Sequence, residues 1–274
     1  MHDSASNSRQ RSELSAGRFV DVRWVDQTGS TNADLLQIAP GSPAVARVLF
    51  ADEQTNGRGR LDRSWEQASG GGLMVSFFVP WSNAATAHLV PTALGVAIVG
   101  AAEASGRSVG LKWPNDVVIP AGAAEDDSVG ELVGKKVGGM LSSSVVTNNV
   151  FRGVVAGLGC NISWPPPDFA ELPEAAALDH LPGPPVDREV LAADLVSGFD
   201  RELTTIEQRG PVELLDRYRH RCVTIGQRVS VEQGAERIVG RATDIDESGA
   251  LLLEVEGRQR RIDVGDVKHL RPAE

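Results

Sequence analysis

The chain has 274 residues, 41% of them hydrophobic and 23% charged, and a formal net charge of −10 at pH 7. This length suits one large domain, or a main domain with a small appendage, because single cores stop growing at roughly 250 to 300 residues. The acidic balance argues against a general polyanion-binding protein, so any affinity for nucleic acid or an anionic membrane has to come from a local patch.

The N-terminus and the cysteines indicate a cytoplasmic, soluble protein. Residues 1–19 are polar and lack the apolar core of a secretory signal, so we expect a disordered leader there. The richest apolar stretch, residues 91–104, is shorter than the roughly 18 residues of a membrane span and contains two glycines. Cys160 and Cys222 match no metal or redox spacing, and we expect two reduced, packed thiols.

The first part of the chain predicts a mixture of strands and helices. Ser30 or Thr31 can cap a short helix, which Pro40 and Gly41 end. Asn148 and Asn149 favour a hairpin turn between two later strands. Strands are predicted over residues 46–54, 72–80, 109–113, 136–146 and 150–162, and further helices over residues 89–104 and from Asp187 onward.

Composition changes in three later segments. Residues 121–134 are acidic and turn-rich, which predicts a solvated loop. Residues 164–185 hold too much proline for a continuous element. From Cys222 to Leu270, short alternating segments are separated by glycine-containing turns, which is typical of a small β-barrel. We therefore expect a catalytic domain over residues 20–221 and a barrel over residues 222–274.

Residues 57–65, "GRGRLDRSW", form a basic segment that we call the arginine loop. Its sequence fits a solvated arginine-glycine turn, an RNA-contacting segment, or a clamp for an anion such as carboxylate or phosphate. Trp65 adds a possible stacking face for a base, although a lone tryptophan is more often part of a core.

Three further segments combine polar residues with strand ends or glycines. "KWPND", residues 112–116, is either a tight Asx turn or a site at a strand end. "KKVGGML", residues 135–141, places two lysines before a strand in which Gly138 and Gly139 leave room for a ligand. "GLGCNI", residues 157–162, indicates either a bulge or the close approach of a ligand.

Taken in order, these segments resemble biotin protein ligases over about residues 20 to 272. The resemblance implies an α+β catalytic domain with a mixed sheet and helices, related to class II aminoacyl-tRNA synthetases, followed by an SH3-like barrel. It also implies that biotin and ATP form biotinyl-5′-AMP, whose acyl group passes to a lysine of a carrier protein. The segments that carry the resemblance are Ser30–Thr31–Asn32, Gln54 with residues 57–65, residues 112–116, residues 136–141 and residues 157–161.

The resemblance also assigns roles to individual residues. Lys136, Arg58, Arg60 and Asp116 would be catalytic, with Asp116 the candidate base for the carrier lysine. Biotin would be bound by Ser30, Thr31, Asn32, Gln54, Gly57, Arg58, Lys136, Gly157 and Gly159. ATP would be bound by Arg58, Arg60, Arg63, Trp65, Lys112, Asn115 and Asn161. Mg²⁺ would arrive with ATP, and no protein metal site is expected.

Two departures and several alternatives accompany this interpretation. Asp62 stands where most relatives have glycine, and the acidic segment at 121–134 is longer than usual. Lipoate or octanoyl ligases share the fold, but "KWPND" and the complete arginine loop favour biotin. A nucleic-acid-binding module would leave Gln54, Asn115 and Lys136 without a role. The implied partner is the biotin carboxyl carrier of an acyl-CoA or pyruvate carboxylase, not DNA or a membrane, and the implied state is a monomer or weak homodimer.

Overall fold

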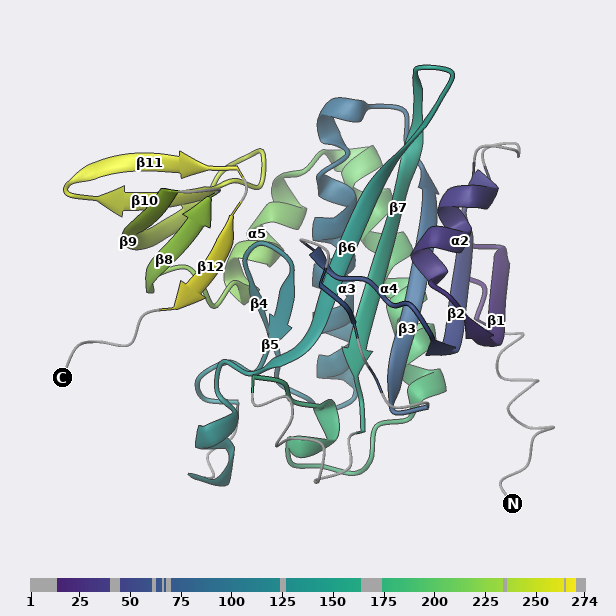
Figure 1. The fold of residues 1–274 in the computed structure, drawn as a ribbon, viewed down its shortest axis with the longest axis horizontal. Helices are drawn as coiled ribbons and strands as arrows, with labels where there is room; N and C mark the ends of the chain where they lie inside the picture. The colour runs from purple at the N-terminus through teal and green to yellow at the C-terminus, as the bar shows by residue number, and fades with distance from the viewer. Residues whose placement is uncertain are drawn as a thin grey trace.

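Two β-sheets organise the chain (Figure 1). The computed structural model describes residues 14–39, 45–60, 63–65, 67, 70–123, 127–163, 174–233, 236–263 and 265–269. A seven-stranded sheet is built from the strands before residue 162, and a five-stranded antiparallel sheet follows at the C-terminal end. The predicted α+β class with a separate C-terminal β-module is confirmed.

The larger sheet has the strand order β1-β2-β3-β7-β6-β5-β4. β1 and β2 are parallel, and the other neighbours are antiparallel. Asn148 and Asn149 have φ values of 51° and 61°, which fits the predicted tight hairpin between β6 and β7. The strands are β1 (Asp21–Thr28), β2 (Arg47–Gln54), β3 (Gly72–Pro80), β4 (Gly110–Lys112), β5 (Asp116–Val118), β6 (Lys136–Thr147) and β7 (Val150–Asn161).

Helices cover the two faces of this sheet unequally. In Figure 1, α3 and α4 lie behind the sheet, whereas α2 and the connection from β2 to β3 cross its front. The Asp187 carboxylate caps α4 by accepting bonds from the amides of Glu189 and Val190. The α-helices are α2 (Thr31–Ile38), α3 (Leu89–Ala104), α4 (Arg188–Arg209) and α5 (Val212–Arg221), with 3₁₀ turns η3 (Ala84–Thr86), η4 (Asp127–Leu132) and η6 (Leu178–His180).

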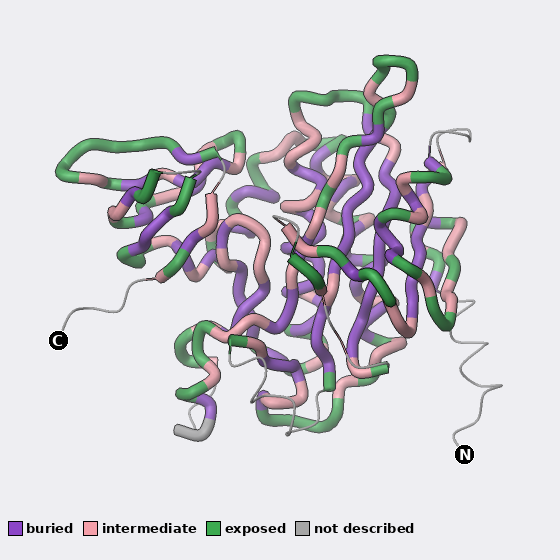
Figure 2. The backbone as a smooth tube through the Cα atoms, in the orientation of Figure 1, coloured by how far each residue is buried: buried purple, intermediate pink, exposed green. Residues whose placement is uncertain are grey.

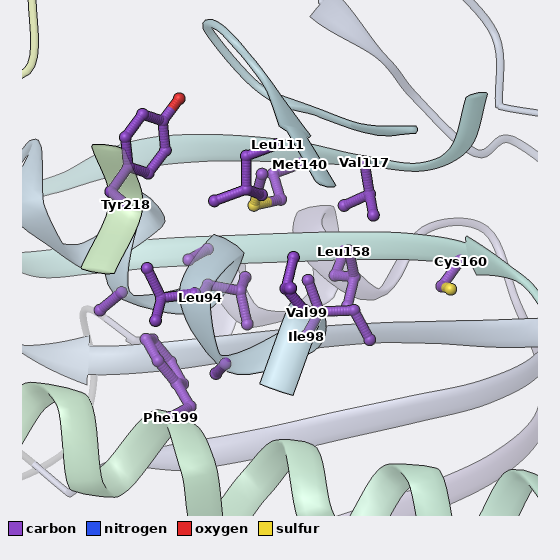
Figure 3. Close-up of a cluster of buried hydrophobic side chains, with 14 of the residues drawn as sticks. Leu94, Ile98, Val99, Leu111, Val117, Met140, Leu158, Cys160, Phe199 and Tyr218 are labelled. Carbon is purple, nitrogen blue, oxygen red and sulfur yellow. The ribbon is translucent and has the colours of Figure 1, made fainter. Parts of the chain in front are cut away.

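The main core fills the space between the sheet and α3 with α4. Figure 3 shows Leu94 and Ile98 of α3 beside Leu158 of β7, with Phe199 of α4 on the other side. The central strands are drawn purple along much of their length in Figure 2, and consecutive residues of β3 from Gly72 to Val79 are all buried. Residues 84–104 are long and apolar enough to span a membrane by length and composition alone, and the buried core helix of a globular domain meets the same criterion. Because α3 and α4 pack against them, β3, β6 and β7 form a well-packed base for the front face of the sheet.

The C-terminal sheet packs against α5 and the turn between β4 and β5. Trp113 of that turn donates its backbone N–H to Thr224 Oγ1 at 3.0 Å and its indole N–H to the Gly249 carbonyl at 2.9 Å. The sheet has the order β11-β10-β9-β8-β12, from β8 (Arg228–Gln233), β9 (Glu236–Ile245), β10 (Leu251–Val255), β11 (Arg258–Ile262) and β12 (Asp266–His269). The two bonds of Trp113 thus fix the "KWPND" segment, residues 112–116, against Thr224 and Gly249.

The prediction of a disordered leader is wrong for residues 14–19. Leu14 is 3% exposed, and Phe19 is fully buried in a cluster with the rings of Phe77 and Phe199. Arg18 donates to Asp200 of α4 at 2.9 Å. The segment is polar in composition, yet these two apolar side chains pack into the core. Residues 1–13 lie outside the described residues.

Other predictions need smaller corrections. Residues 121–134 are not simply a solvated loop, because they include η4 and place Val129 in the core at 3% exposure. β1, β5 and α5 were not predicted: β1 is a half-exposed edge strand, β5 has three residues, and α5 is a short polar helix. The prediction of two packed thiols is confirmed, since both cysteines are free and buried.

Candidate functional site

A cleft opens on the front face of the large sheet, beneath the connection from β2 to β3. Its empty space, counted together with the open solvent at its mouth, is about 470 Å³. Its walls come from α2, the end of β2, the arginine loop, β3, β6 and β7. The lining residues are Ser30, Thr31, Asn32, Gln54, Arg58, Gly59, Arg60, Trp65, Val75, Ser76, Asn115, Lys136, Gly139, Met140, Leu141, Gly157, Leu158 and Gly159.

Glycines make the floor of the cleft flat. Gly139 of β6 pairs with Gly159 of β7, and the Trp65 indole lies over them. A Cβ at Gly159 would lie 2.4 Å from Trp65 Cε2, and a Cβ at Gly157 would lie 2.8 Å from Asn32 Nδ2. Side chains at these positions would fill the cleft, so the glycines in β7 serve the close approach of other groups and not a bulge.

One end of the cleft is a buried polar network at the N-terminus of α2. Gln54 Oε1 accepts from the Thr31 amide at 2.8 Å and from Thr31 Oγ1 at 3.1 Å. Thr31 Oγ1 also lies 2.8 Å from Ser76 Oγ. Asn32 Nδ2 donates to the Leu141 carbonyl at 3.1 Å. These groups offer both donors and acceptors in an otherwise apolar region, which suits a small polar ring more than a chain of methylenes.

The other end of the cleft is cationic. Arg58, Arg60 and Lys136 line it, and none of the lining residues is acidic. Arg60 Nη1 donates to Asn115 Oδ1 at 2.9 Å, and Asn115 Nδ2 donates to the Met140 carbonyl at 2.9 Å. In a chain of net charge −10, this local excess of positive charge favours an anionic ligand.

Lys136 is held at this end through both its backbone and its side chain. Its amide donates to the Glu174 carbonyl and its carbonyl accepts from the Ala176 amide, each at 2.8 Å. Its Nζ lies 2.6 Å from Asp116 Oδ1 and 5.4 Å from the centre of the Trp65 ring. The ammonium group is therefore oriented before any ligand arrives.

The arginine loop is a compact turn in its described part. The Gly59 amide donates to the Arg63 carbonyl at 2.7 Å, and the Trp65 amide donates to the Gly57 carbonyl at 3.0 Å. Trp65 Nε1 is buried without a hydrogen-bond partner among the described residues. A buried donor without a partner is costly, and this one lies against Gly159 on the floor of the cleft. Asp62 lies outside the described residues.

Several predicted residues do not line the cleft. Arg63 pairs with Asp266 of the C-terminal sheet, and this hydrogen bond raises the pKa of its guanidinium. Lys112 lies near His269 of the same sheet, whose pKa it lowers in addition to the effect of burial. Asn161 is 4% exposed and donates to the Ala176 carbonyl. Gly57 and Asp116 stand just behind the lining, at the backbone of Trp65 and at Lys136.

Sequence reasoning missed the role of Ser76. It is 1% exposed and sits in the middle of β3, whose other interior residues are apolar. A hydroxyl inside an apolar strand was a usable signal, because a buried polar side chain needs a partner. Val75, Met140, Leu141 and Leu158 also line the cleft and complete its apolar wall. In the described ranges, no group of three or more His, Cys, Asp or Glu could hold a metal ion.

Comparison with known families identifies this fold and cleft. Residues 24–161 match the Biotin/lipoate A/B protein ligase family, and residues 224–270 match the biotin protein ligase C-terminal domain. This chain belongs to the Biotin/lipoate A/B protein ligase family. The first match spans β1 to β7 and therefore every residue of the cleft lining, and the second spans the C-terminal sheet.

Individual ligases of this family resemble the chain over most of its length. It is 35% identical to the biotin–[acetyl-CoA-carboxylase] ligase of Mycobacterium tuberculosis (strain ATCC 25618 / H37Rv), over 94% of this chain and 91% of that protein. It is 28% identical to the bifunctional ligase/repressor BirA of Bacillus subtilis (strain 168), over 89% of this chain and 72% of that protein. Both matches extend beyond the cleft-bearing segment into the C-terminal sheet.

A solved ligase structure shares the arrangement of both sheets. The biotin protein ligase of Aquifex aeolicus in complex with biotin and ATP matches with a TM-score of 0.73 and 24% identity, covering 93% of this chain and all of that one. At this level of identity the match shows the common fold. It agrees with the mixed sheet and C-terminal β-module that the sequence predicts.

Proposed function

We propose that this chain is an ATP-dependent biotin ligase that forms biotinyl-5′-AMP and transfers biotin to a lysine of a carboxyl carrier protein. The carrying observation is the division of the cleft into a buried polar network at one end and a cationic end, lined by Arg58, Arg60 and Lys136, at the other. Biotin has the matching division, with a polar ureido ring, an apolar chain and a terminal carboxylate.

The ureido ring fits the network around Thr31. Gln54 and the hydroxyls of Thr31 and Ser76 can rotate their donors and acceptors to meet the ring N–H and C=O groups. Ser30 and Asn32 lie beside them at the start of α2. Gly157 lets the Asn32 and Ser76 side chains lie close to the floor beside the ring, and Gly159 lets the Trp65 indole lie against it. The role of Gly57 is to let the loop backbone pass close to Trp65.

In the first step, the biotin carboxylate attacks the α-phosphorus of ATP and pyrophosphate leaves. Two anions must approach, and the charges of Arg58, Arg60 and Lys136, with Mg²⁺ brought by ATP, offset their repulsion. No base is needed, because a carboxyl group with a pKa near 4 is already ionised at neutral pH. Trp65 supplies a stacking face for adenine, and Asn115 supplies a polar contact. Three predicted residues lie further from the cleft and can contact the nucleotide only if the loop and the strand ends move: Arg63, Lys112 and Asn161.

In the second step, the carrier lysine attacks the acyl carbon and AMP leaves. A lysine with a pKa near 10.4 is a free amine in only about one molecule in 2,500 at pH 7, so a base has to help. Asp116 is our candidate, and its Oδ1 also lies 2.6 Å from Lys136 Nζ. An Asp116→Asn variant separates its two possible roles. Retained adenylation with lost transfer supports the base, whereas loss of both steps supports a role in orienting Lys136.

The first experiment is ATP–pyrophosphate exchange by the purified protein with biotin or lipoate. Exchange that depends on biotin supports the proposal. Exchange with lipoate alone would move the assignment to the lipoate branch, which the match of residues 224–270 to a biotin ligase domain disfavours. No exchange with either acid, in folded protein with Mg²⁺, would rule out the enzyme.

The partner and location follow from this chemistry. Relatives named as acetyl-CoA-carboxylase ligases favour the carrier of an acyl-CoA carboxylase as the lysine substrate. We propose that the reaction takes place in the cytoplasm, where ATP and such carriers occur. A pyruvate carboxylase carrier and a monomeric or weakly dimeric state stay predictions, which a biotinylation assay on purified carriers and a sedimentation measurement would test.

A further inference from the structure

Arg107 is a buried cation whose partners are backbone carbonyl groups. It lies in the connection between α3 and β4 and is 1% exposed, although a buried charge is costly unless hydrogen bonds replace its water. Its Nε donates to the Leu178 carbonyl and its Nη1 to the Pro182 carbonyl, each at 3.0 Å, and its Nη2 donates to the Pro184 carbonyl. The guanidinium group therefore holds residues 178–184 at three points.

Residues 178–184 are shaped to this side chain. Pro182 and Pro184 interrupt any regular helix or strand there, so the carbonyl groups need donors from elsewhere in the fold. Gly183 has a φ of 137°, and a Cβ at its position would lie 2.0 Å from Arg107 Nη1. The chain thus bends closely around the guanidinium group, which a glycine allows.

The same stretch continues from the residues that hold the backbone of Lys136. The Lys136 amide donates to the Glu174 carbonyl and the Ala176 amide donates to the Lys136 carbonyl, each at 2.8 Å. Ala176 and Leu178 are both fully buried. Because Leu178 follows so soon after Ala176, Arg107 fixes one end of the stretch that supports Lys136.

Lys136 depends on this support because the sheet itself holds it weakly. The pairing of β6 with β7 begins only at Gly138. The pairing of β6 with β5 shifts register between Val117 and Val118, and Val118 lies opposite Lys136. A register shift interrupts the hydrogen-bond ladder, so residues 174–176 supply the backbone bonds that fix the first residue of β6.

We propose that Arg107 is a positioning residue for the reaction, which acts through residues 174–178 on the backbone of Lys136. This inference rests on the proposed function. Lys136 lines the cationic end of the cleft, where the biotin carboxylate and the α-phosphate have to meet. A catalytic group displaced by about 1 Å can cost about 10²-fold in rate. Loss of Arg107 loosens the backbone of Lys136 and therefore lowers kcat, while the KM for biotin changes little, because the polar network around Thr31 comes from other elements.

The first experiment compares ATP–pyrophosphate exchange by full-length variants at a temperature at which urea unfolding shows each of them folded. Arg107→Met removes the charge and the donors, and we expect kcat to fall about tenfold with a KM for biotin within about twofold of wild type. Arg107→Lys keeps the charge but lacks the planar fork that reaches three carbonyls, and we expect about a threefold fall in kcat. Phe199→Leu loosens the core around Phe19 and Phe77 and is the control for general destabilisation, with no change in kcat expected.

Two further measurements separate positioning from a merely structural role. In a Lys136→Ala background, Arg107→Met is expected to lower kcat no further, because the side chain through which it acts is already removed. Amide hydrogen exchange at Lys136 and Ala176 is expected to be about tenfold faster in Arg107→Met, whereas the amide of Val75 in β3 keeps its wild-type rate.

A wild-type kcat in Arg107→Met would overturn the proposal, as would an equal fall in Phe199→Leu or a further fall of similar size in the Lys136→Ala background. If Arg107→Met does not fold, Arg107→Lys decides, and wild-type kcat with wild-type amide exchange in that variant would overturn the proposal. If the wild type shows no biotin-dependent pyrophosphate exchange, the proposed function itself has failed, which is a distinct result.

Discussion

The floor of the cleft and the loop that covers it are built in different ways. The floor consists of β3, β6 and β7, whose backbones are paired along their length and whose interior residues are buried. In its described part, residues 57–60 and 63–65, the arginine loop has few backbone bonds, and its Arg60 and Arg63 side chains contact Asn115 and Asp266. The floor supplies shape, and the loop supplies charge.

This difference indicates how the two steps of the reaction can share one site. A rigid floor keeps the position of biotin fixed, since packed strands have no low-energy alternatives. A loop held by a few exposed polar contacts can open for substrates and close for chemistry. Substitutions in the floor should therefore alter binding, and substitutions of the charged groups should alter rate.

The largest effect is expected for Lys136→Ala, at the junction of floor and loop. Lys136 is oriented by Asp116 and lies in the cationic end, so its loss removes charge where the two anions meet. Loss of one such group typically lowers the rate by about 10²–10³. Biotin-dependent pyrophosphate exchange measures this, with Lys135→Ala as the neighbouring control. A comparable loss in the control would show that the effect is not specific to the site.

A floor substitution, Gly159→Ala, is expected to have the next largest effect. The added Cβ would lie 2.4 Å from Trp65 Cε2 and displace the indole. Overpacking of about 1–3 kcal/mol corresponds to roughly a 5- to 150-fold rise in the KM for ATP. Gly100→Ala in α3 is the control, because nothing lies within 4 Å of its Cβ. If both variants keep the wild-type KM, the indole does not depend on the flat floor.

The sequence was sufficient for those parts of the site that depend on local motifs. The predicted residues that lie within or beside a short motif at a strand or helix end do line the cleft. They are Ser30, Thr31, Gln54, Arg58, Arg60, Asn115 and Lys136. Arg63 and Lys112 belong to the same motifs but face the C-terminal sheet. Their partners are Asp266 and His269, far along the chain, and no local pattern encodes such a contact.

Fold predictions failed where local patterns were weak. β1 is a half-exposed edge strand whose charged residues obscure the alternation of a strand. Residues 14–19 look polar, yet Phe19 packs against two aromatic rings. Ser76 was hidden for the opposite reason, because its strand is so apolar that the single hydroxyl was passed over.

A smaller effect is expected for Ser76→Ala, which tests whether the floor binds the ureido ring. The variant removes one bond to Thr31, whose hydroxyl keeps its bond to Gln54. A loss of about 1 kcal/mol corresponds to roughly a fivefold rise in the KM for biotin, with little change in kcat. Ser144→Ala, on an exposed position of β6, is the control. A fall in kcat with an unchanged KM would instead place Ser76 in the chemical step.

The smallest effect is expected for His269, which lies where the C-terminal sheet meets Thr224 and the turn between β4 and β5. Burial, together with the charge of Lys112, lowers the pKa of His269 to about 4 from 6.5. As the pH falls below 6.5, His269 binds a proton in the unfolded chain but stays neutral in the folded protein. Its contribution to the free energy of unfolding is therefore full above pH 6.5 and is lost between pH 6.5 and 4. Urea unfolding at pH 7, 6, 5 and 4 should show this decline, and His269→Gln should reduce it, with the remainder coming from His88, whose pKa burial also lowers.

His220→Gln, on the exposed side of α5, is the control for this experiment and should keep the wild-type slope. The pKa of the Asp246 carboxyl is lowered to about 2, because hydrogen bonds from Ser248 and Arg261 outweigh the effect of burial. Its contribution to stability is therefore lost only below pH 3.8. The two groups therefore act in nearly separate pH ranges.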